Sequence, residues 1–316
     1  MASSAVLLLI LMVVAATVHG HTHTPGGTPA ALFWEAALPD SPMPESIAHL
    51  VQKGTDHSPL QQHHSAAMIL PNACLGYSYR IICNSPAQQA SSVEGLFFRE
   101  SDMRVGRTMT VALPAFDPAP FLPRKAAERI PFGNLADALD RFGITPGSQE
   151  AARVGETLSA CREAPLAGSR KACATSLEGV VLSATRMLAT SRPLVAAASA
   201  LPNSGLPRRT YTVQAIKPLG GGGGGYVACH SRAYPYAVYE CHMMEGSSEE
   251  AYVVSIRGGS GLPTVDMAAV CHFDTSNWIP AHPAFKILGT HPGGSPVCHF
   301  LPYADLMFGV KMADNA

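Results

Sequence analysis

The sequence CHSRAYPYAVYECH, residues 229–242, begins and ends with the dipeptide Cys-His. The dipeptide occurs twice more, at Cys271-His272 and Cys298-His299, so half of the eight cysteines are followed directly by a histidine. The four pairs are separated by 10, 28 and 25 residues in turn. The residues that lead into each pair are β-prone, and neighbouring side chains on a strand point to opposite faces of a sheet. The pattern therefore predicts cysteines on one face of a sheet and histidines on the other.

The cysteine face favours disulfide bonds, because thiols in an exported protein become oxidised. Eight cysteines allow 105 connectivities, so the sequence alone leaves the pairing open. We expect the four cysteines of the Cys-His pairs to form two disulfides: Cys229, Cys241, Cys271 and Cys298. A further disulfide between Cys161 and Cys173 would join two predicted helices, with a stabilisation of roughly 3 kcal/mol. Cys74 and Cys83 could form a disulfide that closes a local loop.

The histidine face favours a metal ion or a polar pocket. Imidazole suits copper and zinc, and histidines without an available thiolate favour Cu(II) over Cu(I). The candidate metal ligands are His230, His242, His272 and His299. Copper is the one candidate cofactor. A local hydrogen bond for each histidine is the alternative. His282 and His291 are possible additional ligands, and His21 and His23 could bind copper or zinc from the N-terminal arm.

The N-terminus predicts export. Residues 5–18 are almost wholly apolar, and Val18-His19-Gly20 fits a cleavage site, which is typical of a secretory signal peptide over residues 1–20. An uncut signal anchor is the alternative, but the run is short for a membrane span. We expect a secreted, extracellular protein, without a membrane partner after cleavage.

The remaining pattern predicts an α+β fold. Residues 21–95 predict a variable N-terminal region or linker, because residues 56–94 lack a clear period, and residues 96–312 predict the folded domain. Helices are expected after the caps Asn134, Ser148 and either Thr175 or Ser176. Strands are expected at 97–98 and 108–113, around a turn at Gly106, and from residue 211 onward, including 284–288. Gly220 to Gly225 predict a hairpin loop between strands, with an interdomain linker as the alternative. Helical segments should pack on a mainly antiparallel, disulfide-braced β domain.

Composition and missing motifs exclude several function classes. Only 14% of residues are charged and the net charge is −1, without a basic stripe, so we expect no nucleic-acid partner. The chain lacks the nucleophile elbow Gly-x-Ser-x-Gly, the zinc motif HExxH and the phosphate-binding P-loop. Its carboxylates suggest no acid–base pair. Catalytic residues and oligomeric state are therefore left unassigned.

The spacing of the Cys-His pairs, with Phe97-Phe98 upstream, resembles the plant BURP-domain family. The middle gap of 28 residues is about one longer than the family pattern. Other similar stretches are Cys173-Ala174-Thr175-Ser176-Leu177-Glu178, Cys271-His272-Phe273-Asp274-Thr275 with Trp278, and Pro296-Val297-Cys298-His299-Phe300. Phe33-Trp34 and Ser41-Pro42-Met43-Pro44 resemble the N-terminal stretch of the grass anther and dehydration-responsive members.

The resemblance implies a secreted, non-enzymatic protein that acts with cell-wall components in development or stress responses. The alternative function that the resemblance implies is a copper-dependent autocatalytic peptide cyclase, which crosslinks a Trp or Tyr side chain of its own N-terminal region. In that case the resemblance implies that the four histidines of the Cys-His pairs hold the copper ion. No segment repeats between residues 21 and 95, and Trp34 is the only tryptophan there. We therefore expect no self-cyclisation.

Overall fold

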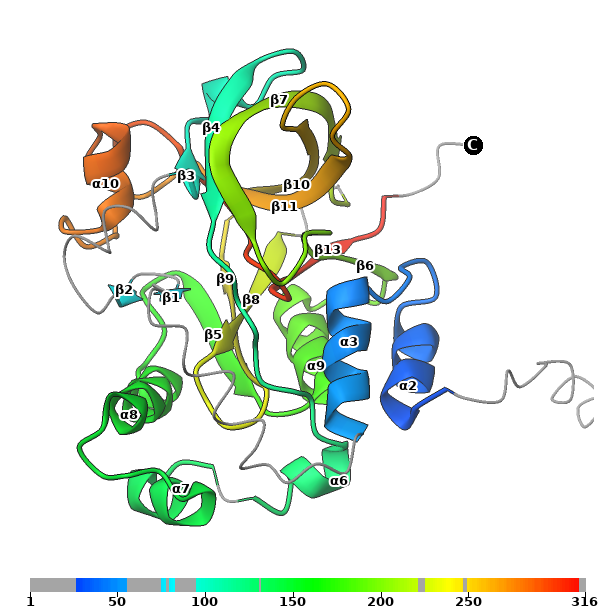
Figure 1. Ribbon diagram of the computed structural model, residues 1–316, viewed down its shortest axis with the longest axis vertical. Coiled ribbons are helices and arrows are strands. Elements are labelled where there is room, and N and C mark those ends of the chain that lie inside the picture. Colours follow the sequence, from blue (N-terminus) through cyan, green and yellow to red (C-terminus); the bar gives the residue numbers. More distant parts are fainter. Residues whose placement is uncertain are drawn as a thin grey trace, which may run out of the picture.

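The computed structural model describes residues 27–55, 75–77, 80–82, 95–130, 132–220, 225–246 and 249–312. Over these residues the chain is α+β with antiparallel sheets, as predicted (Figure 1). The predicted signal peptide lies outside the described residues, as do His21, His23, Cys74 and Cys83.

Two sheets make up most of the β structure. The six-stranded sheet has the order β3 (Phe97–Phe98), β12 (Val297–Phe300), β11 (Thr264–His272), β10 (Glu249–Arg257), β7 (Leu206–Pro218), β4 (Thr108–Leu113). The five-stranded sheet has the order β5 (Ser169–Ala174), β9 (Val238–Met244), β8 (Tyr226–Arg232), β13 (Leu306–Val310), β6 (Leu194–Ala197). A short hairpin joins β1 (Leu75–Tyr77) to β2 (Arg80–Ile82). The strands predicted at 97–98 and 108–113 therefore lie at opposite edges of one sheet.

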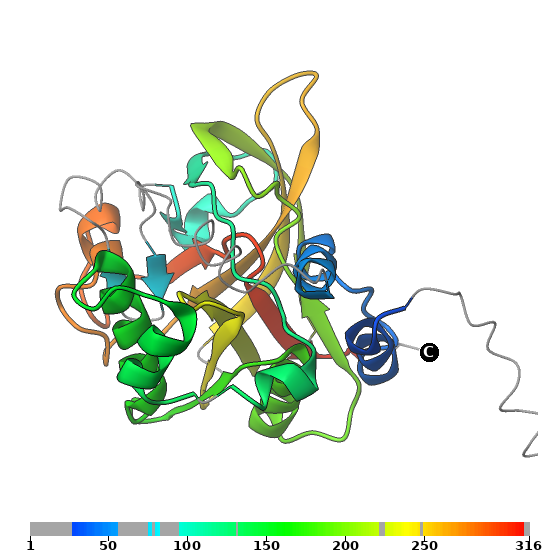
Figure 2. The ribbon, with the colours of Figure 1, turned by 60° about the horizontal axis from the view of Figure 1, so that its bottom comes forward.

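Most helices lie on the side of the five-stranded sheet, whereas α10 (Pro283–Leu288) lies beside β3 of the six-stranded sheet (Figures 1 and 2). The other helices are α2 (Pro29–Ala37), α3 (Glu45–Thr55), α6 (Arg124–Ala127), α7 (Leu135–Phe142), α8 (Gln149–Arg162) and α9 (Leu177–Leu188), with one 3-10 turn at Glu100–Asp102. The predicted caps are confirmed, since Asn134, Ser148 and Ser176 each accept a backbone N–H at the start of a helix. No helix among these residues is long and apolar enough to span a bilayer.

The described part of the region before residue 95 belongs to the core. Trp34 on α2 is fully buried beside Phe308 of β13, and its indole N–H donates to the Ser41 carbonyl over 2.8 Å. Helix α3 buries Ile47 and Leu50 in the same apolar cluster. These two helices are therefore packed elements of the core.

Two local predictions were wrong. The glycine-rich run does not close a hairpin, because β7 pairs with β4 and β10 while β8 pairs with β9 and β13. It connects two sheets instead. Residues 284–288, expected as a strand, form α10: His282 caps its first turn, Pro283 occupies the first helical position and Gly289 ends it with a positive φ of 61°. These are helix signals, and they outweigh a short apolar run.

The two sheets meet through one face of each. Ala268, Val270 and His272 point to the same face of β11. Ala268 and Val270 join Met307 of β13 in a small apolar cluster. The opposite faces, which carry the cysteines, belong to the main cluster together with Val180 and Val181 of α9. The histidine faces are therefore the ones that approach each other.

Candidate functional site

The four cysteines of the Cys-His pairs form two disulfides, as predicted. Cys229 of β8 lies directly opposite Cys241 of β9, and the two Cα atoms are 3.9 Å apart. Cys271 of β11 lies directly opposite Cys298 of β12, with a Cα separation of 4.0 Å. All four side chains are fully buried. Each disulfide therefore fixes the register of one strand pair.

The predicted disulfide between Cys161 and Cys173 is also present, with a Cα separation of 5.6 Å. Its setting differs from the prediction. Cys161 lies on α8, but Cys173 lies on β5 at the edge of the five-stranded sheet. The bond ties a helix to a sheet, and the expected staple between two helices was wrong.

The register of each disulfide places the histidines diagonally across the neighbouring strands. His230 lies opposite Glu240 and His242 lies opposite Ala228, so the two imidazoles share a face. Their ring centroids are 5.3 Å apart and the planes differ by 20°. His272 and His299 repeat this arrangement in the other sheet, with centroids 5.4 Å apart and an interplanar angle of 17°. Two separate strand pairs therefore present the same stacked pair of rings.

The two stacked pairs meet between the sheets. The ring centroids of His230 and His299 are 6.2 Å apart, which joins the four imidazoles in the order His242, His230, His299, His272. We call these four side chains the histidine row. His299 is half-buried and the other three are buried. The sequence therefore identified four side chains that the fold brings together, although they come from strands of different sheets.

Two further rings extend the row beyond His272. The Trp278 ring lies 4.9 Å from that of His272, and the His282 ring lies 4.6 Å from that of Trp278. The Nδ1 atom of His282 accepts the Ala284 N–H at the start of α10. His291, the other additional candidate, is exposed, and its Nδ1 atom donates to the Pro292 carbonyl over 2.9 Å. His282 therefore lies near the row and His291 does not join it.

Oxygen acceptors face the Nδ1 atoms of three histidines in the row. Nδ1 of His230 is 2.7 Å from a carboxylate oxygen of Asp305, and Nδ1 of His299 is 3.1 Å from the Phe300 carbonyl oxygen. Nδ1 of His272 is 2.7 Å from Glu249 Oε1, although this contact is poorly aligned for a hydrogen bond. Carboxylates and carbonyls accept protons and do not donate them. The proton therefore belongs on Nδ1 of His230 and His299, and the nearby Glu249 carboxylate favours the same position in His272, which leaves the Nε2 lone pairs available.

The free lone pairs face one another. Nε2 of His272 lies 3.3 Å from Nε2 of His299. Two imidazoles that both carry their proton on Nδ1 would repel at this distance unless a proton or a metal ion lay between them. Nε2 of His230 is buried and has no hydrogen-bond partner among the described residues. A proton or a metal ion between the Nε2 atoms of His272 and His299 would relieve their repulsion.

Burial favours the neutral form of several of these rings. It lowers the pKa of His299 well below the usual value, and the neighbouring His272 and His230 lower it further. Burial also lowers the pKa of His242 well below the usual value, with His230 as the next cause. The pKa of His282 falls to about 4, through burial and the proximity of His272. Neutral imidazoles are the form that coordinates metal ions.

The donor set fits a transition-metal ion in part. Two ligands bound at about 2.0 Å in the tetrahedral geometry of zinc lie about 3.3 Å apart, which is the spacing between the His272 and His299 Nε2 atoms. Neighbouring ligands in the square-planar geometry of Cu(II) lie about 2.8 Å apart, so copper would draw the two rings closer. Within the described ranges, however, no three His, Cys, Asp or Glu side chains are already arranged to hold one ion. The stacked rings explain this, since parallel imidazoles do not all aim at one point. His230 would have to turn to become a third ligand.

Sequence reasoning missed the carboxylates. Glu249 lies directly opposite His272 across β10 and β11, so it becomes visible only when the strand register is known. Asp305 lies just before β13, a strand that the sequence pattern did not predict. The position of Trp278, six residues after a Cys-His pair, is visible in the sequence. Its contact with His272 is not, because that contact depends on the turn before α10.

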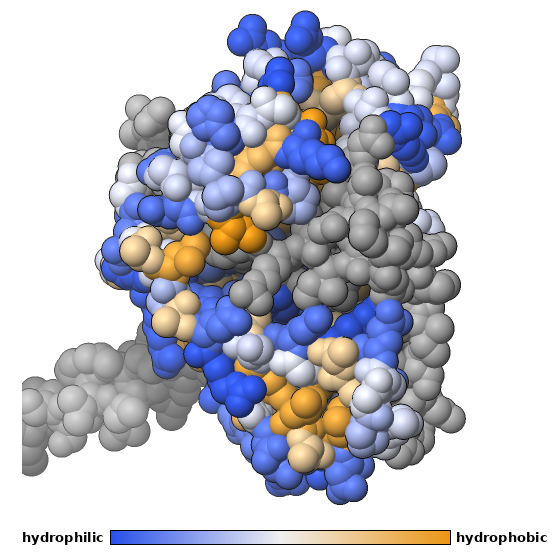
Figure 3. All heavy atoms as spheres, turned by 90° about the vertical axis from the view of Figure 1, so that its left-hand side faces the viewer, coloured by the Kyte–Doolittle hydropathy of each residue, from blue (hydrophilic) through white to orange (hydrophobic). Residues whose placement is uncertain are grey.

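The segment between β11 and α10 encloses the end of the row. Trp278 and His282 are buried, whereas Phe273 and Ile279 expose 40% and 48% of their surfaces. Figure 3 shows the side of the molecule on which α10 lies in Figure 1, where apolar patches are interspersed among hydrophilic side chains. This segment separates the His272 end of the row from solvent.

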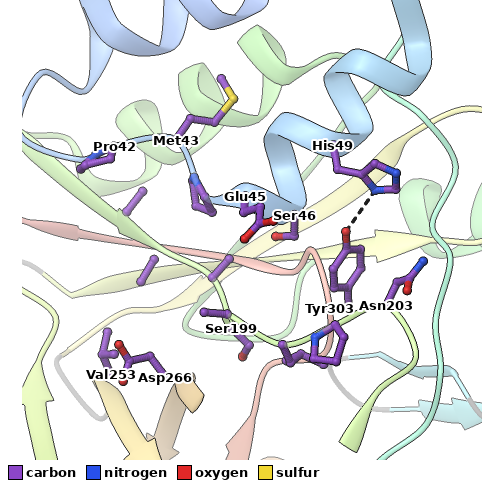
Figure 4. A pocket seen from close by; sticks show the side chains of 17 residues that line it. Pro42, Met43, Glu45, Ser46, His49, Ser199, Asn203, Val253, Asp266 and Tyr303 are labelled. Carbon is purple, nitrogen blue, oxygen red and sulfur yellow. Dashed lines mark hydrogen bonds between the residues drawn. The ribbon is translucent and has the colours of Figure 1, made fainter. Parts of the chain in front are cut away.

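A hollow of about 900 Å³ lies elsewhere, where the start of α3 faces the chain between β6 and β7 (Figure 4). None of the rings of the histidine row lines it. Several of its polar groups are paired, since Tyr303 bonds His49 over 3.1 Å and Asp266 bonds Ser255 over 2.5 Å. The histidine row, with its facing nitrogens, is therefore the stronger candidate site.

Comparison with protein families matches residues 96–310 to the BURP domain. Protein RAFTIN 1B of Triticum aestivum is 34% identical over 357 aligned residues, which cover 98% of each chain. BURP domain-containing protein 2 of Oryza sativa subsp. japonica is 33% identical over 318 residues, covering 98% of this chain and 99% of the relative. BURP domain-containing protein 13 of the same plant is 42% identical over 256 residues, covering 76% of this chain and 61% of the relative.

Proposed function

Because this chain belongs to the BURP-domain family, we propose that it is a secreted protein whose histidine row binds a divalent transition-metal ion, Cu(II) foremost. It acts in the extracellular space or cell wall, in development or stress responses, without an enzymatic activity of its own. The site of action, the biological role and cell-wall partners rest on the family resemblance. The metal site rests on the geometry of the row.

A single observation carries the metal site: the Nε2 atoms of His272 and His299 face each other at 3.3 Å while both Nδ1 atoms contact oxygen acceptors. All six cysteines of the described residues are in disulfides, so no thiolate from them competes for the ion. Imidazole nitrogens without thiolate favour Cu(II). His272 and His299 would hold the ion, with His230 as the next ligand. A bound copper ion supplies Lewis-acid and one-electron chemistry.

Secretion is supported by the cysteine chemistry together with the apolar N-terminal run. Three disulfides lie within the described residues, and two of them are fully buried in the main cluster. Such bonds form and persist in oxidising compartments.

The structure gives no support to self-crosslinking at Trp34, the tryptophan upstream of the domain. The indole is fully buried and its N–H is bonded to the Ser41 carbonyl. A crosslink there would require α2 to leave the core. Mass spectrometry of the copper-treated protein tests this point, because a crosslink removes two hydrogens from the peptide that contains Trp34.

We expect the purified, oxidised protein to bind one Cu(II) ion per chain. Copper retained after desalting, measured by elemental analysis, should fall to background in the double variant His272→Ala/His299→Ala. Electron paramagnetic resonance of the wild type should show nitrogen ligands. The matched control is His291→Ala, because His291 is exposed and outside the row, and this variant should bind as the wild type does.

The two tryptophans locate the bound ion. Trp278 lies next to His272, whereas Trp34 packs on Phe308, so copper should quench the fluorescence of Trp34→Phe and leave that of Trp278→Phe nearly unchanged. Stoichiometric copper in a folded His272→Ala/His299→Ala protein would refute the proposed site. Near-ultraviolet circular dichroism confirms that each variant keeps its packing.

A further inference from the structure

One buried carboxylate lies beside each stacked pair of imidazoles in the histidine row. Asp305 and Glu249 are only 3% and 7% exposed. Each faces Nδ1 of the first histidine in its strand pair at 2.7 Å: Asp305 faces His230 and Glu249 faces His272. Two carboxylates from different parts of the chain therefore lie beside Nδ1 of one imidazole in each stacked pair, and the Asp305 contact is the one aligned as a hydrogen bond.

The second oxygen of each carboxylate is held by the backbone. Asp305 Oδ1 accepts the Ser231 N–H over 2.9 Å, and Glu249 Oε2 accepts the Met244 N–H over 3.4 Å. The backbone contact fixes which oxygen faces the imidazole. Because that oxygen can only accept, the ring must carry its proton on Nδ1 and present Nε2 as a lone pair.

We infer that Asp305 and Glu249 are positioning residues that fix the tautomers of His230 and His272, so that the Nε2 atoms are the metal ligands. This inference rests on the proposed metal site and extends it to residues that do not touch the ion. Carboxylates that hold a ligand histidine in this way typically contribute 10–100-fold to metal affinity.

Replacing each carboxylate by the amide of the same shape tests the inference. In Asp305→Asn, an amide oxygen kept on the Ser231 N–H leaves the NH₂ group pointing at His230 Nδ1. That nitrogen must then accept, and the proton moves to Nε2. In Glu249→Gln, an oxygen kept on the Met244 N–H has the same effect on His272. A change of one atom should therefore move the proton to the other ring nitrogen without changing the side-chain shape.

The first measurement uses the metal-free protein. Imidazole nitrogen and carbon chemical shifts at pH 8 should report the Nδ1–H tautomer for His230 and His272 in the wild type. Asp305→Asn should convert His230 to the Nε2–H tautomer, and Glu249→Gln should convert His272. The second measurement is copper affinity, which each variant should lower by about 10–100-fold.

The chain offers matched controls. Glu250→Gln alters the next carboxylate on β10, which is exposed and bonded to Tyr252, and Asp266→Asn alters a carboxylate in the hollow. Both should keep wild-type tautomers and copper affinity. Unchanged tautomers or wild-type affinity in Asp305→Asn and Glu249→Gln would overturn the inference while the proposed metal site stands. A wild type that binds no copper would instead refute the metal site, and the tautomers alone would then decide the role of the carboxylates.

Discussion

Replacement of Cys229, Cys241, Cys271 and Cys298 by alanine is expected to leave the protein unfolded at 25 °C. The loop-entropy estimate gives roughly 3 kcal/mol for the disulfide that spans 12 residues and about 3.5 kcal/mol for the one that spans 27. The combined loss is comparable to the whole stability of a typical domain, about 5–15 kcal/mol. All four side chains are also fully buried, so their removal leaves voids in the core.

Far- and near-ultraviolet circular dichroism of the purified variant should show the loss of tertiary packing. The matched control replaces Cys161 and Cys173, whose disulfide also spans 12 residues but ties α8 to an edge strand. That variant should be destabilised by roughly 3 kcal/mol and remain folded. A four-alanine variant with a native near-ultraviolet spectrum would show that packing alone holds the sheets.

Acid should destabilise the metal-free protein strongly below pH 6.5. His282 has a pKa of about 4 in the folded chain and about 6.5 when unfolded. The unfolded state therefore binds the proton first, and the stabilisation is complete above pH 6.5 and lost as the pH falls towards 4. His242 and His299 act in the same direction, since burial also lowers their pKa values. His282 alone corresponds to roughly 3 kcal/mol.

His282→Asn isolates this contribution, because an asparagine oxygen can still cap α10 but does not titrate. Urea unfolding with a chelator present gives the free energy of unfolding at pH 7 and at pH 4.5. The difference between the two pH values should be smaller in His282→Asn by roughly 2 kcal/mol. An equal difference in both proteins would mean that His282 has the same pKa in the folded and unfolded states.

The sequence predicted what depends on neighbouring residues. Alternation along a strand separated the cysteine face from the histidine face, and the caps Asn134, Ser148 and Ser176 marked three helix starts. Both are properties of a few consecutive residues. The same local reasoning could have found α10, because His282, Pro283 and Gly289 are helix signals.

The sequence could not predict which strands pair. The strands on either side of the glycine-rich run look alike locally, yet they belong to different sheets, because partners are chosen by burial against distant elements. For the same reason the contact between His230 and His299, and the approach of Asp305, could not be anticipated. The candidate ligands were therefore predictable, while the residues that orient them were not.

The position of β13 determines when the five-stranded sheet can close during synthesis. This strand, Leu306–Val310, lies between β8 and β6, so a sheet whose other members are synthesised earlier stays split until residues 306–310 have been made. Closing such distant partners is slow compared with forming local hairpins. The five-stranded sheet should therefore close only after its other strands exist, and a chain that stops before residue 306 should lack the strand that joins β8 to β6.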